Sequence, residues 1–458
     1  LGGYAAQIVP DGLYAGANCM AVREALFTRF SWEMLLGFEN ARGIWFPGIH
    51  TAAKFALYVA RKGGKTAALR VAFLIRTTEA LRLAVAGGTL KVPITTVQDF
   101  SPDALAVMEF RGQRDVDIAT RMYSPWPKFG DAREGFPLRQ YMAEIHMGND
   151  RAVFTEDPTG VPVYEGRMVA QYDHRAKIYS AGRGRAAEWP EIPFGDARKA
   201  IKPQWFIPSK NLSERTEPRV ARFRVGFCDV ASPTNERSLV ATIIPSGCIA
   251  GHSVPTFTFP DEDAWQYLIW LAVANSFSMD YLARQKVSLH MSFAILDSLP
   301  FPRILVEDLR SRQLATRVLR LVCTGMEMIP FWNMIADAQG WVERVPEDGT
   351  PPGVVDDEMR RRLIAEIEAI VARELFGLTG EELDYVMETF PIVKERDIKE
   401  FGEYHTKRLV LAAYDALAEA ARTGHAHVSR STRRPRIQAW GFKGHHGADP
   451  SEWPADLR

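Results

Sequence analysis

Cysteine is scarce in this chain of 458 residues, and its four cysteines lie far apart, at Cys19, Cys228, Cys248 and Cys323. No two of them form a Cys-x-x-Cys pair, which argues against a thiolate zinc site and against a disulfide framework. This pattern is typical of free thiols in a reducing compartment, so we expect a cytoplasmic protein. The longest apolar run, near 267–277, is too short to cross a bilayer, and we expect no membrane contact.

An excess of charge of either sign is also missing. Lys and Arg total 56 and Asp and Glu total 56, so no global basic field points to a nucleic-acid partner. The chain has no His-Glu-x-x-His and no Gly-x-Ser-x-Gly motif, which excludes two common hydrolase signatures. Gly63-Gly64-Lys65-Thr66 is similar to the end of a phosphate loop, but Val59 stands where the first glycine of that motif belongs.

One metal-nuclease spacing remains as an alternative. Asp384, Asp397 and Lys399 follow the order acid, then Asp-x-Lys, which is the order of a metal-dependent nuclease core. Such a core normally lies on strands, whereas the periodicity here predicts helix. The nuclease reading is therefore the weakest of those we keep.

The first part of the chain has an α/β pattern. The spacing of apolar residues predicts strands at 4–10, 32–38, 55–60 and 68–75, and helices at 18–30 and 79–86. Strands that alternate with helices are typical of a sheet covered by helices. With 458 residues, we expect two to four domains.

The remaining sequence divides into a β-rich part and a helical part. Short β-type runs at 163–171, 219–229 and 239–244 alternate with Pro and Gly, which predicts an irregular β module. Apolar periodicity predicts long helices at 263–285, 356–376 and 398–422. Residues 424–458 are rich in His, Arg, Gly and Pro, and we expect a flexible tail there.

The most informative stretch is 161–177, which combines cations, rings and hydrogen-bonding side chains. From 160 to 224, thirteen Lys and Arg residues face seven acids, a local excess of +6 inside a neutral chain. Cations beside stacking and hydrogen-bonding groups suit a phosphate backbone with base edges, although a solvated surface would have the same composition. A Gly-Arg-Gly-Arg loop follows at 182–185.

This stretch resembles a signature of large adenine-specific DNA methyltransferases of the type IIG restriction–modification and BREX/DISARM phage-defence kind. The family signature reads roughly Pro-x-Tyr-Glu-Gly-Lys-Met-Ile-x-Gln-Phe-Asp-His-Arg and lies in the target-recognition region. Three further segments resemble the same family in the same order: 2–62, which includes Gly37-Phe38-Glu39-Asn40; 234–300, which includes Ala283-Arg284-Gln285-Lys286; and 358–411, which includes Gly402-Glu403-Tyr404.

The resemblance implies a parent reaction, methyl transfer from S-adenosyl-L-methionine to N6 of adenine in double-stranded DNA. It also implies that the family's glycine loop and Asn-Pro-Pro motif lie outside this chain, because no Asn-Pro-Pro or Asp-Pro-Pro occurs in it. We therefore expect the second half of such an enzyme, which cannot methylate alone. The N-terminal half of the same enzyme, and possible other defence subunits, would be its protein partners. A non-catalytic DNA-binding subunit of a defence complex is the alternative.

The fold class that follows is α/β plus α, with four predicted parts. Residues 1–105 would be the C-terminal part of a Rossmann-like methyltransferase sheet, 106–305 the target-recognition module, 306–422 a helical region and 423–458 a basic tail. Phe38 and Phe55 are candidates for the wall of the base pocket, with core packing as the alternative. The predicted DNA contacts are Arg167, Gln171, His174, Arg175, Lys177, Arg183, Arg185, Lys210, Arg215, Arg284, Gln285 and Lys286, the last three as an exposed helix end that grips phosphate.

Overall fold

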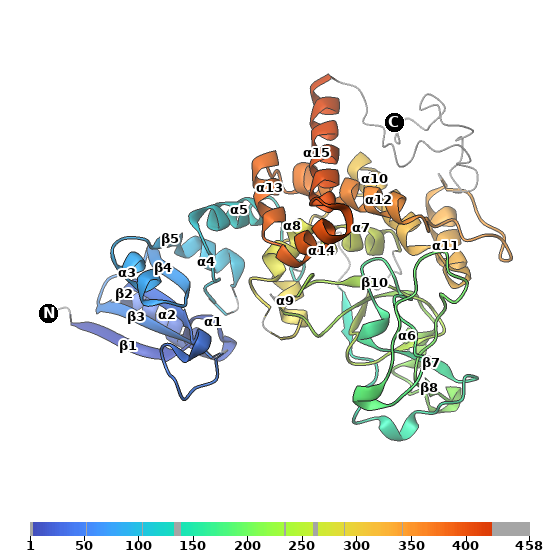
Figure 1. Cartoon of the computed structure of the whole chain (residues 1–458), viewed down its shortest axis with the longest axis horizontal. Helices are drawn as coiled ribbons and strands as arrows, with labels where there is room; N and C mark the ends of the chain where they lie inside the picture. The colour runs from blue at the N-terminus through green and yellow to red at the C-terminus, as the bar shows by residue number, and fades with distance from the viewer. Residues whose placement is uncertain are drawn as a thin grey trace. The chain divides into compact units, whose positions relative to one another are not determined.

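A computed structural model describes residues 3–51, 53–102, 104–131, 139–232, 235–259, 264–287, 289–340 and 342–423. The predicted basic tail, apart from Thr423, lies outside these residues. The chain forms two units, Leu1–Lys128 with Ser298–Pro300, and Phe129–Asp297 with Phe301–Arg458 (Figure 1). Within the described residues, no helix combines the length and apolar character that a bilayer crossing needs.

The first unit contains a five-stranded sheet in the order β1-β3-β2-β4-β5 (Figure 1). Strands β1 and β2 are both antiparallel to β3, which lies between them, so they are parallel to each other. The strands are β1 Tyr4–Pro10, β2 Phe30–Glu39, β3 Lys54–Lys62, β4 Ala68–Ile75 and β5 Leu90–Pro93. The helices are α1 Gly12–Ala15, α2 Met20–Arg29, α3 Thr78–Val85, α4 Ile94–Phe100 and α5 Gln113–Tyr123.

Two apolar layers stabilise this sheet. Trp32 packs against Phe27 of α2 at a ring distance of 5.1 Å. Leu36, Phe38 and Ile75 form a second cluster with Ala84 of α3. Strand β1, by contrast, is exposed along almost its whole length. It pairs with β3 on one side only and is therefore an edge strand.

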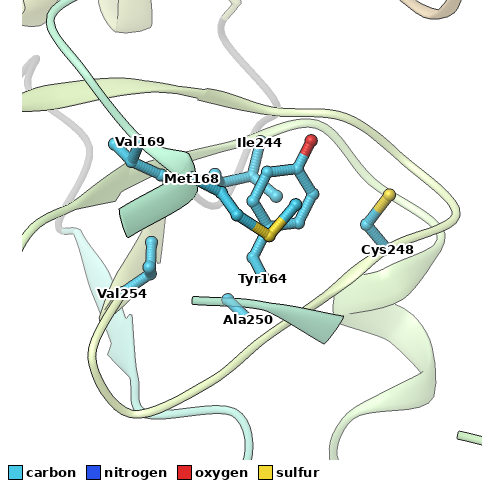
Figure 2. Packing of buried hydrophobic residues seen from close by; sticks show 7 residues of the cluster. All are labelled: Tyr164, Met168, Val169, Ile244, Cys248, Ala250 and Val254. Carbon is cyan, nitrogen blue, oxygen red and sulfur yellow. The ribbon is translucent and has the colours of Figure 1, made fainter. Parts of the chain in front are cut away.

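The second unit begins with two small sheets, in the orders β10-β9-β12-β6 and β11-β7-β8 (Figure 1). A buried cluster between them contains Tyr164, Met168, Ile244, Cys248 and Val254 (Figure 2). The strands are β6 Gln140–Met142, β7 Val161–Tyr164, β8 Phe206–Ile207, β9 Arg224–Phe227, β10 Ala241–Ile244, β11 Ile249–Ala250 and β12 Thr256–Thr258. Most of this region is turns and short 3-10 segments, as an irregular β module predicts.

The rest of the second unit is helical. Helix α10 packs against α7 and α12, and α12 packs against α15. The helices are α6 Glu217–Val220, α7 Ala264–Ala274, α8 Phe277–Ala283, α9 Phe293–Asp297, α10 Leu309–Val322, α11 Ile329–Gln339, α12 Asp357–Ile370, α13 Gly380–Glu388, α14 Pro391–Phe401 and α15 His405–Thr423. The chain is therefore a mixed α/β protein with several sheets, as the sequence predicts.

Several predicted elements differ from the structure. The predicted strand 219–229 begins within α6 and is a strand only at β9. The predicted helix 263–285 is two helices, because Ser276 caps α8 by accepting a hydrogen bond from the Met279 N–H. The predicted helix 398–422 is also two, because Gly402 ends α14 in the left-handed region at φ 77°. The predicted strand 163–171 ends at Tyr164 and continues as a 3-10 turn.

Candidate nucleic-acid interface

Residues 177–191 form an ordered loop on the surface of the β module. Two isolated bridges close it, one between Lys177 and Glu191 and one between Ala181 and Glu188. Gly182 adopts φ +82°, and a Cβ there would lie 2.1 Å from the Ala186 carbonyl oxygen, so only glycine fits this turn. The turn presents Arg183 to solvent, with 74% of its side chain exposed. The side chain of Arg185 is outside what the structure describes.

Two rings and two cations accompany the 177–191 loop. Tyr179 and Trp189 lie 5.6 Å apart, and the Arg167 guanidinium lies 5.1 Å from the Trp189 ring centre. The Tyr179 hydroxyl donates to the Gly182 carbonyl at 2.6 Å, and its N–H donates to the Lys202 carbonyl at 2.8 Å. Arg167 and Lys202 are exposed. The loop therefore combines mobile charge with fixed rings on one surface.

Arg183 forms an ion pair with Glu156, whose side chain is 58% exposed. An exposed pair of this kind contributes about 0 to 1 kcal/mol of stability. A phosphate could replace the carboxylate at little cost, because both side chains already lie in solvent. Arg183 is therefore available to an anionic ligand.

His174 and Arg175 have a different environment, which corrects their predicted role. The side chains of His174 and Arg175 are 1% and 8% exposed, and both lie against Glu327. His174 Nε2 is 2.6 Å from the Glu327 carboxylate and Arg175 Nε is 3.1 Å from it. Burial opposes ionisation of Glu327, but the hydrogen bond and charge of His174 and the charge of Arg175 outweigh it and lower its pKa to about 2. Buried groups paired in this way hold the module together and do not reach DNA.

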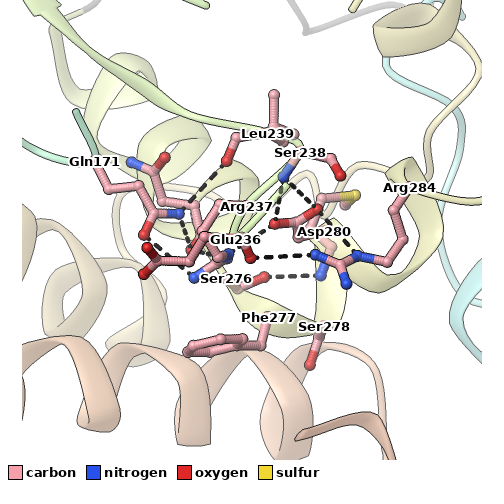
Figure 3. A network of polar contacts seen from close by, with 12 residues as sticks. Gln171, Glu236, Arg237, Ser238, Leu239, Ser276, Phe277, Ser278, Asp280 and Arg284 are labelled. Atoms are coloured by element: carbon pink, nitrogen blue, oxygen red, sulfur yellow. Dashed lines mark hydrogen bonds and ion pairs between the residues drawn. The ribbon is translucent and has the colours of Figure 1, made fainter. Parts of the chain in front are cut away.

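Gln171 is also engaged inside the protein (Figure 3). Its Nε2 donates to the Asn275 carbonyl at 3.0 Å, and its Oε1 accepts from Arg237 at 3.2 Å. Arg237 also donates to Asp280 at 2.7 Å and lies 4.0 Å from the Phe277 ring centre. Both ends of the Gln171 amide are occupied, so it cannot read a base in this arrangement. Arg237 forms its ion pair with Asp280, and Glu236 forms one with Arg396.

The predicted helix end 284–286 does not form an exposed cationic phosphate-binding surface. The Arg284 side chain is 9% exposed, lies 3.8 Å from the Phe390 ring centre and donates to the Thr389 carbonyl. Gln285 donates to the Tyr281 carbonyl at 3.1 Å, and Gln285 and Lys286 are only partly exposed. Arg284 therefore joins the end of α8 to the segment after α13, while Gln285 binds within its own helix.

Lys210 and Arg215 are exposed, as DNA contacts must be. Arg215 makes only a long hydrogen bond, 3.4 Å, to the Ala143 carbonyl. Burial nevertheless reduces the basic excess of this region. Between 160 and 224, eight cations and six acids have exposed or half-buried side chains that the structure describes, because Arg175, Lys199, Arg219 and Arg224 are buried. The surface there is only slightly basic, with its cations gathered at particular loops.

In the first unit, aromatic and charged side chains meet where the parallel strands β1 and β2 end. Phe38 and Phe55 stack at 4.8 Å with an interplanar angle of 4°, and Trp45 contacts Phe38 edge-on at 5.1 Å. Phe38 is 4% exposed, so the core-packing alternative holds for it, and it cannot wall a pocket. Phe55 is half-buried and remains a candidate. The predicted wall is thus reduced to one ring.

A charged cluster lies at the same edge of this sheet. The Tyr14 hydroxyl donates to Glu109 at 2.6 Å and Lys54 donates to the same carboxylate at 2.7 Å. Burial and the Glu109 charge raise the pKa of Tyr14, so it stays protonated. Ligands of open α/β sheets commonly bind at the carboxyl ends of parallel strands. This edge is therefore the second place where a ligand could bind.

The nuclease alternative finds no support in the arrangement of its residues. Asp397 is 1% exposed, and its carboxylate accepts a hydrogen bond from the Thr406 N–H at 2.6 Å, which ties α14 to α15. Asp384 pairs with Lys407 at 2.7 Å, and Lys399 lies on α14 in solvent. Across the described parts of the chain, no three His, Cys, Asp or Glu side chains gather in a way that could hold a metal ion.

Sequence reasoning missed two members of the loop surface, Tyr179 and Trp189, and it gave no weight to Lys202. Trp189 stands four residues after the end of the Gly-Arg repeat, so a search for rings next to the basic loop would have found it. Lys202 is distant in sequence, and only the backbone pairing of its carbonyl with Tyr179 brings it to the loop.

Comparisons with known proteins complete the description. No protein-family model and no curated protein matches this chain. Among solved structures, it is similar to the type IIL restriction-modification enzyme MmeI in complex with DNA, with a TM-score of 0.39, 10% identity, and coverage of 85% of this chain and 49% of that one. It is also similar to the type IIG restriction endonuclease BpuSI, with a TM-score of 0.32, 11% identity, and coverage of 90% and 47%. The chain spans about half the length of either enzyme, and because both TM-scores are below 0.5 we draw no function from the likeness.

Proposed function

We propose that this chain is the DNA-recognition portion of a site-specific adenine-N6 DNA methyltransferase that acts in restriction–modification or phage defence and uses S-adenosyl-L-methionine. The observation that carries the proposal is the 177–191 loop. It carries Arg183 and Lys177, and it lies beside Arg167, Lys202 and the paired rings of Tyr179 and Trp189. Cations that contact phosphates position a protein on the duplex, and rings and hydrogen-bonding groups beside them read it.

The ordered backbone of this loop supports binding of a rigid partner. Gly182 and the two bridges fix the loop before a ligand arrives, so that binding costs little conformational entropy. The guanidinium of Arg167 lies over Trp189 and 3.7 Å from the Glu165 carboxylate, and with 46% of its side chain exposed it could still meet a phosphate oxygen. Duplex DNA offers a matching row of fixed anions.

The methyltransferase part of the proposal is supported by the topology of the first unit. Two parallel strands, β1 and β2, enclose the antiparallel β3, and β1 is an exposed edge strand. A long exposed edge strand is a place for another strand to pair. In the proposal, a segment outside this chain pairs there, and it brings the glycine loop and the Asn-Pro-Pro motif that hold S-adenosyl-L-methionine and the adenine amino group.

Within this chain, the residues at the carboxyl ends of β1 and β2 face that missing part. Phe55 would lie against the adenine that leaves the base stack, because such a base is normally held between apolar or aromatic side chains. Tyr14, Lys54 and Glu109 would fix the start of strand β3, which carries Phe55, through their hydrogen bonds. S-adenosyl-L-methionine would supply the methyl group and would be bound mainly by residues of the other segment.

The experiment is a binding titration of the full chain with a fluorescent duplex. We expect the double variant Lys177→Ala/Arg183→Ala to bind about tenfold more weakly than the wild type at 100 mM salt, since it loses two phosphate contacts. Arg422→Ala is the matched control, because Arg422 is 73% exposed and forms an ion pair with Glu419, as Arg183 does with Glu156. Equal affinities of the wild type and the double variant would remove the loop from the proposal.

A further inference from the structure

The loop between β2 and β3, residues 40–53, is fixed by a single buried side chain. Asn40 is fully buried. Its Nδ2 donates to the carbonyls of Phe46 at 2.9 Å and Ile49 at 3.1 Å. Its Oδ1 accepts from the N–H groups of Trp45 at 3.2 Å and Phe46 at 2.9 Å. One side chain therefore makes four hydrogen bonds to the tip and holds it in a defined shape.

This fixed tip exposes large apolar side chains. Ile44 is 49% exposed, Phe46 is 40% exposed and Ile49 is 55% exposed. Behind them, Phe46 contacts Phe55 edge-on at 4.9 Å, so the tip rests on the aromatic cluster of the sheet. Apolar side chains in water cost free energy, and a loop that both exposes and immobilises them is prepared for contact with an apolar surface.

The charge and backbone of the loop point to a particular surface. Residues 40–53 contain Arg42 and His50 and no acid, whereas Lys54, which follows them, is paired with Glu109. Arg42 is exposed and adopts φ 57°, ψ 16°, in the left-handed region that non-glycine residues rarely adopt. Strained residues of this kind collect at functional sites. An apolar tip with an exposed arginine beside it is complementary to DNA, which is apolar between its stacked bases and anionic at its backbone.

We infer that the 44–49 tip is an apolar wedge that enters the base stack of duplex DNA, with Phe46 and Ile49 as its inserting side chains. Proteins that kink or open DNA insert Phe, Ile, Leu, Met or Pro between base steps in this way. The inference rests on the proposed function, since a base must leave the stack before it can be methylated. The wedge fills the space left in the stack, whereas Phe55, below it, would contact the extruded base.

The test compares two duplexes of one sequence, one intact and one with a single abasic site. A wedge enters a pre-formed gap without separating bases, so we expect the wild-type chain to bind the abasic duplex about tenfold more tightly, the factor that 1.4 kcal/mol of stacking corresponds to. Phe46→Ala and Ile49→Ser should each lose most of this preference and bind the two duplexes with nearly equal affinity. Leu83→Ser, which alters a 64% exposed residue of α3, should keep the preference.

Each other outcome has a separate meaning. Wild-type binding with no preference for the abasic duplex, or a preference that both loop variants keep, overturns the wedge and leaves DNA binding in place. Failure of the wild type to bind either duplex refutes the proposed function itself. A wild type that dimerises in sedimentation while Phe46→Ala stays monomeric, with equal DNA preference in both, would show that the tip docks on a second copy and would overturn the wedge.

Discussion

The buried pair of Arg224 and Glu144 gives the sharpest test of which cations of the β module stabilise the fold and which are available to DNA. Both side chains are 0% exposed, and Arg224 donates to both carboxylate oxygens of Glu144, one of them at 2.8 Å. Arg224 also donates to the carbonyls of Cys248 at 2.6 Å and Pro245 at 3.2 Å. Glu144 in turn accepts from the Thr256 hydroxyl at 2.7 Å. The pair therefore joins β9, β12 and the segments beside them.

Replacing Arg224 with Met removes the partner and leaves a buried carboxylate. Burial opposes ionisation of Glu144, and the charge and hydrogen bonds of Arg224 outweigh it and lower its pKa. Breaking a buried pair from one side costs about 3 to 5 kcal/mol. We therefore expect Arg224→Met to lower the unfolding free energy by that amount, and the double variant Arg224→Met/Glu144→Leu to recover much of it, because no charge is then left unpaired.

The assay is urea unfolding of the full chain followed by circular dichroism, with DNA affinity measured on the same preparations. Arg183→Ala is the contrasting variant, since its side chain is 74% exposed. It should change the unfolding free energy by less than about 0.5 kcal/mol and weaken DNA binding. An Arg224→Met chain that is as stable as the wild type would refute the assignment of Arg224 to the interior.

Three further predictions follow from the same structure. Glu327→Gln should lower the unfolding free energy at pH 7 by about 3 kcal/mol. Because the pKa of Glu327 is lowered to about 2 in the folded state, this stabilisation is present above pH 4.5 and is lost as the pH falls towards 2. A difference in unfolding free energy that urea melts show to be independent of pH would contradict the prediction. Burial raises the pKa of Cys228 and of Cys248 to about 12. Iodoacetamide at pH 8 should therefore leave both thiols unmodified in the native chain and label Cys19, and the intact mass would show this. Rapid labelling of all three cysteines would contradict the prediction. Gly182→Ala should distort the 177–191 loop, because its Cβ would meet a carbonyl oxygen at 2.1 Å. The variant should bind DNA severalfold more weakly, with little loss of helix signal in circular dichroism. An unchanged affinity would contradict the claim that this loop binds DNA.

Local patterns in the sequence were sufficient for part of the regular structure, but they did not predict the helices α5, α10 and α11. The predicted strand 68–75 coincides with β4, and the predicted helix 18–30 contains α2. Thr379 and Glu382 form a capping box, with the Thr379 N–H donating to Glu382 at 2.8 Å and the Thr379 hydroxyl accepting from the Glu382 N–H. These features depend on residues only a few positions apart, which is why periodicity and capping rules detect them.

The sequence did not show which of the predicted DNA-contacting residues are buried in the protein and which are exposed. Arg175 and Arg183 look alike in a charge count, yet the first is fixed by Glu327, about 150 positions away, and the second faces solvent. The sequence predicted that Gln171 reads a base, but in the structure its amide is bonded to Arg237 and to the Asn275 carbonyl. Long-range partners decide whether a polar side chain is structural or available, and composition does not contain them.

The most direct test of DNA binding by the 177–191 loop is the salt dependence of duplex affinity. The logarithm of the binding constant falls linearly with the logarithm of salt concentration, by about 0.9 for each phosphate neutralised. We predict that the slope for Lys177→Ala/Arg183→Ala is smaller than that of the wild type by about 1.8, while Arg422→Ala keeps the wild-type slope. Identical slopes for all three chains would contradict the claim that this loop contacts the phosphate backbone.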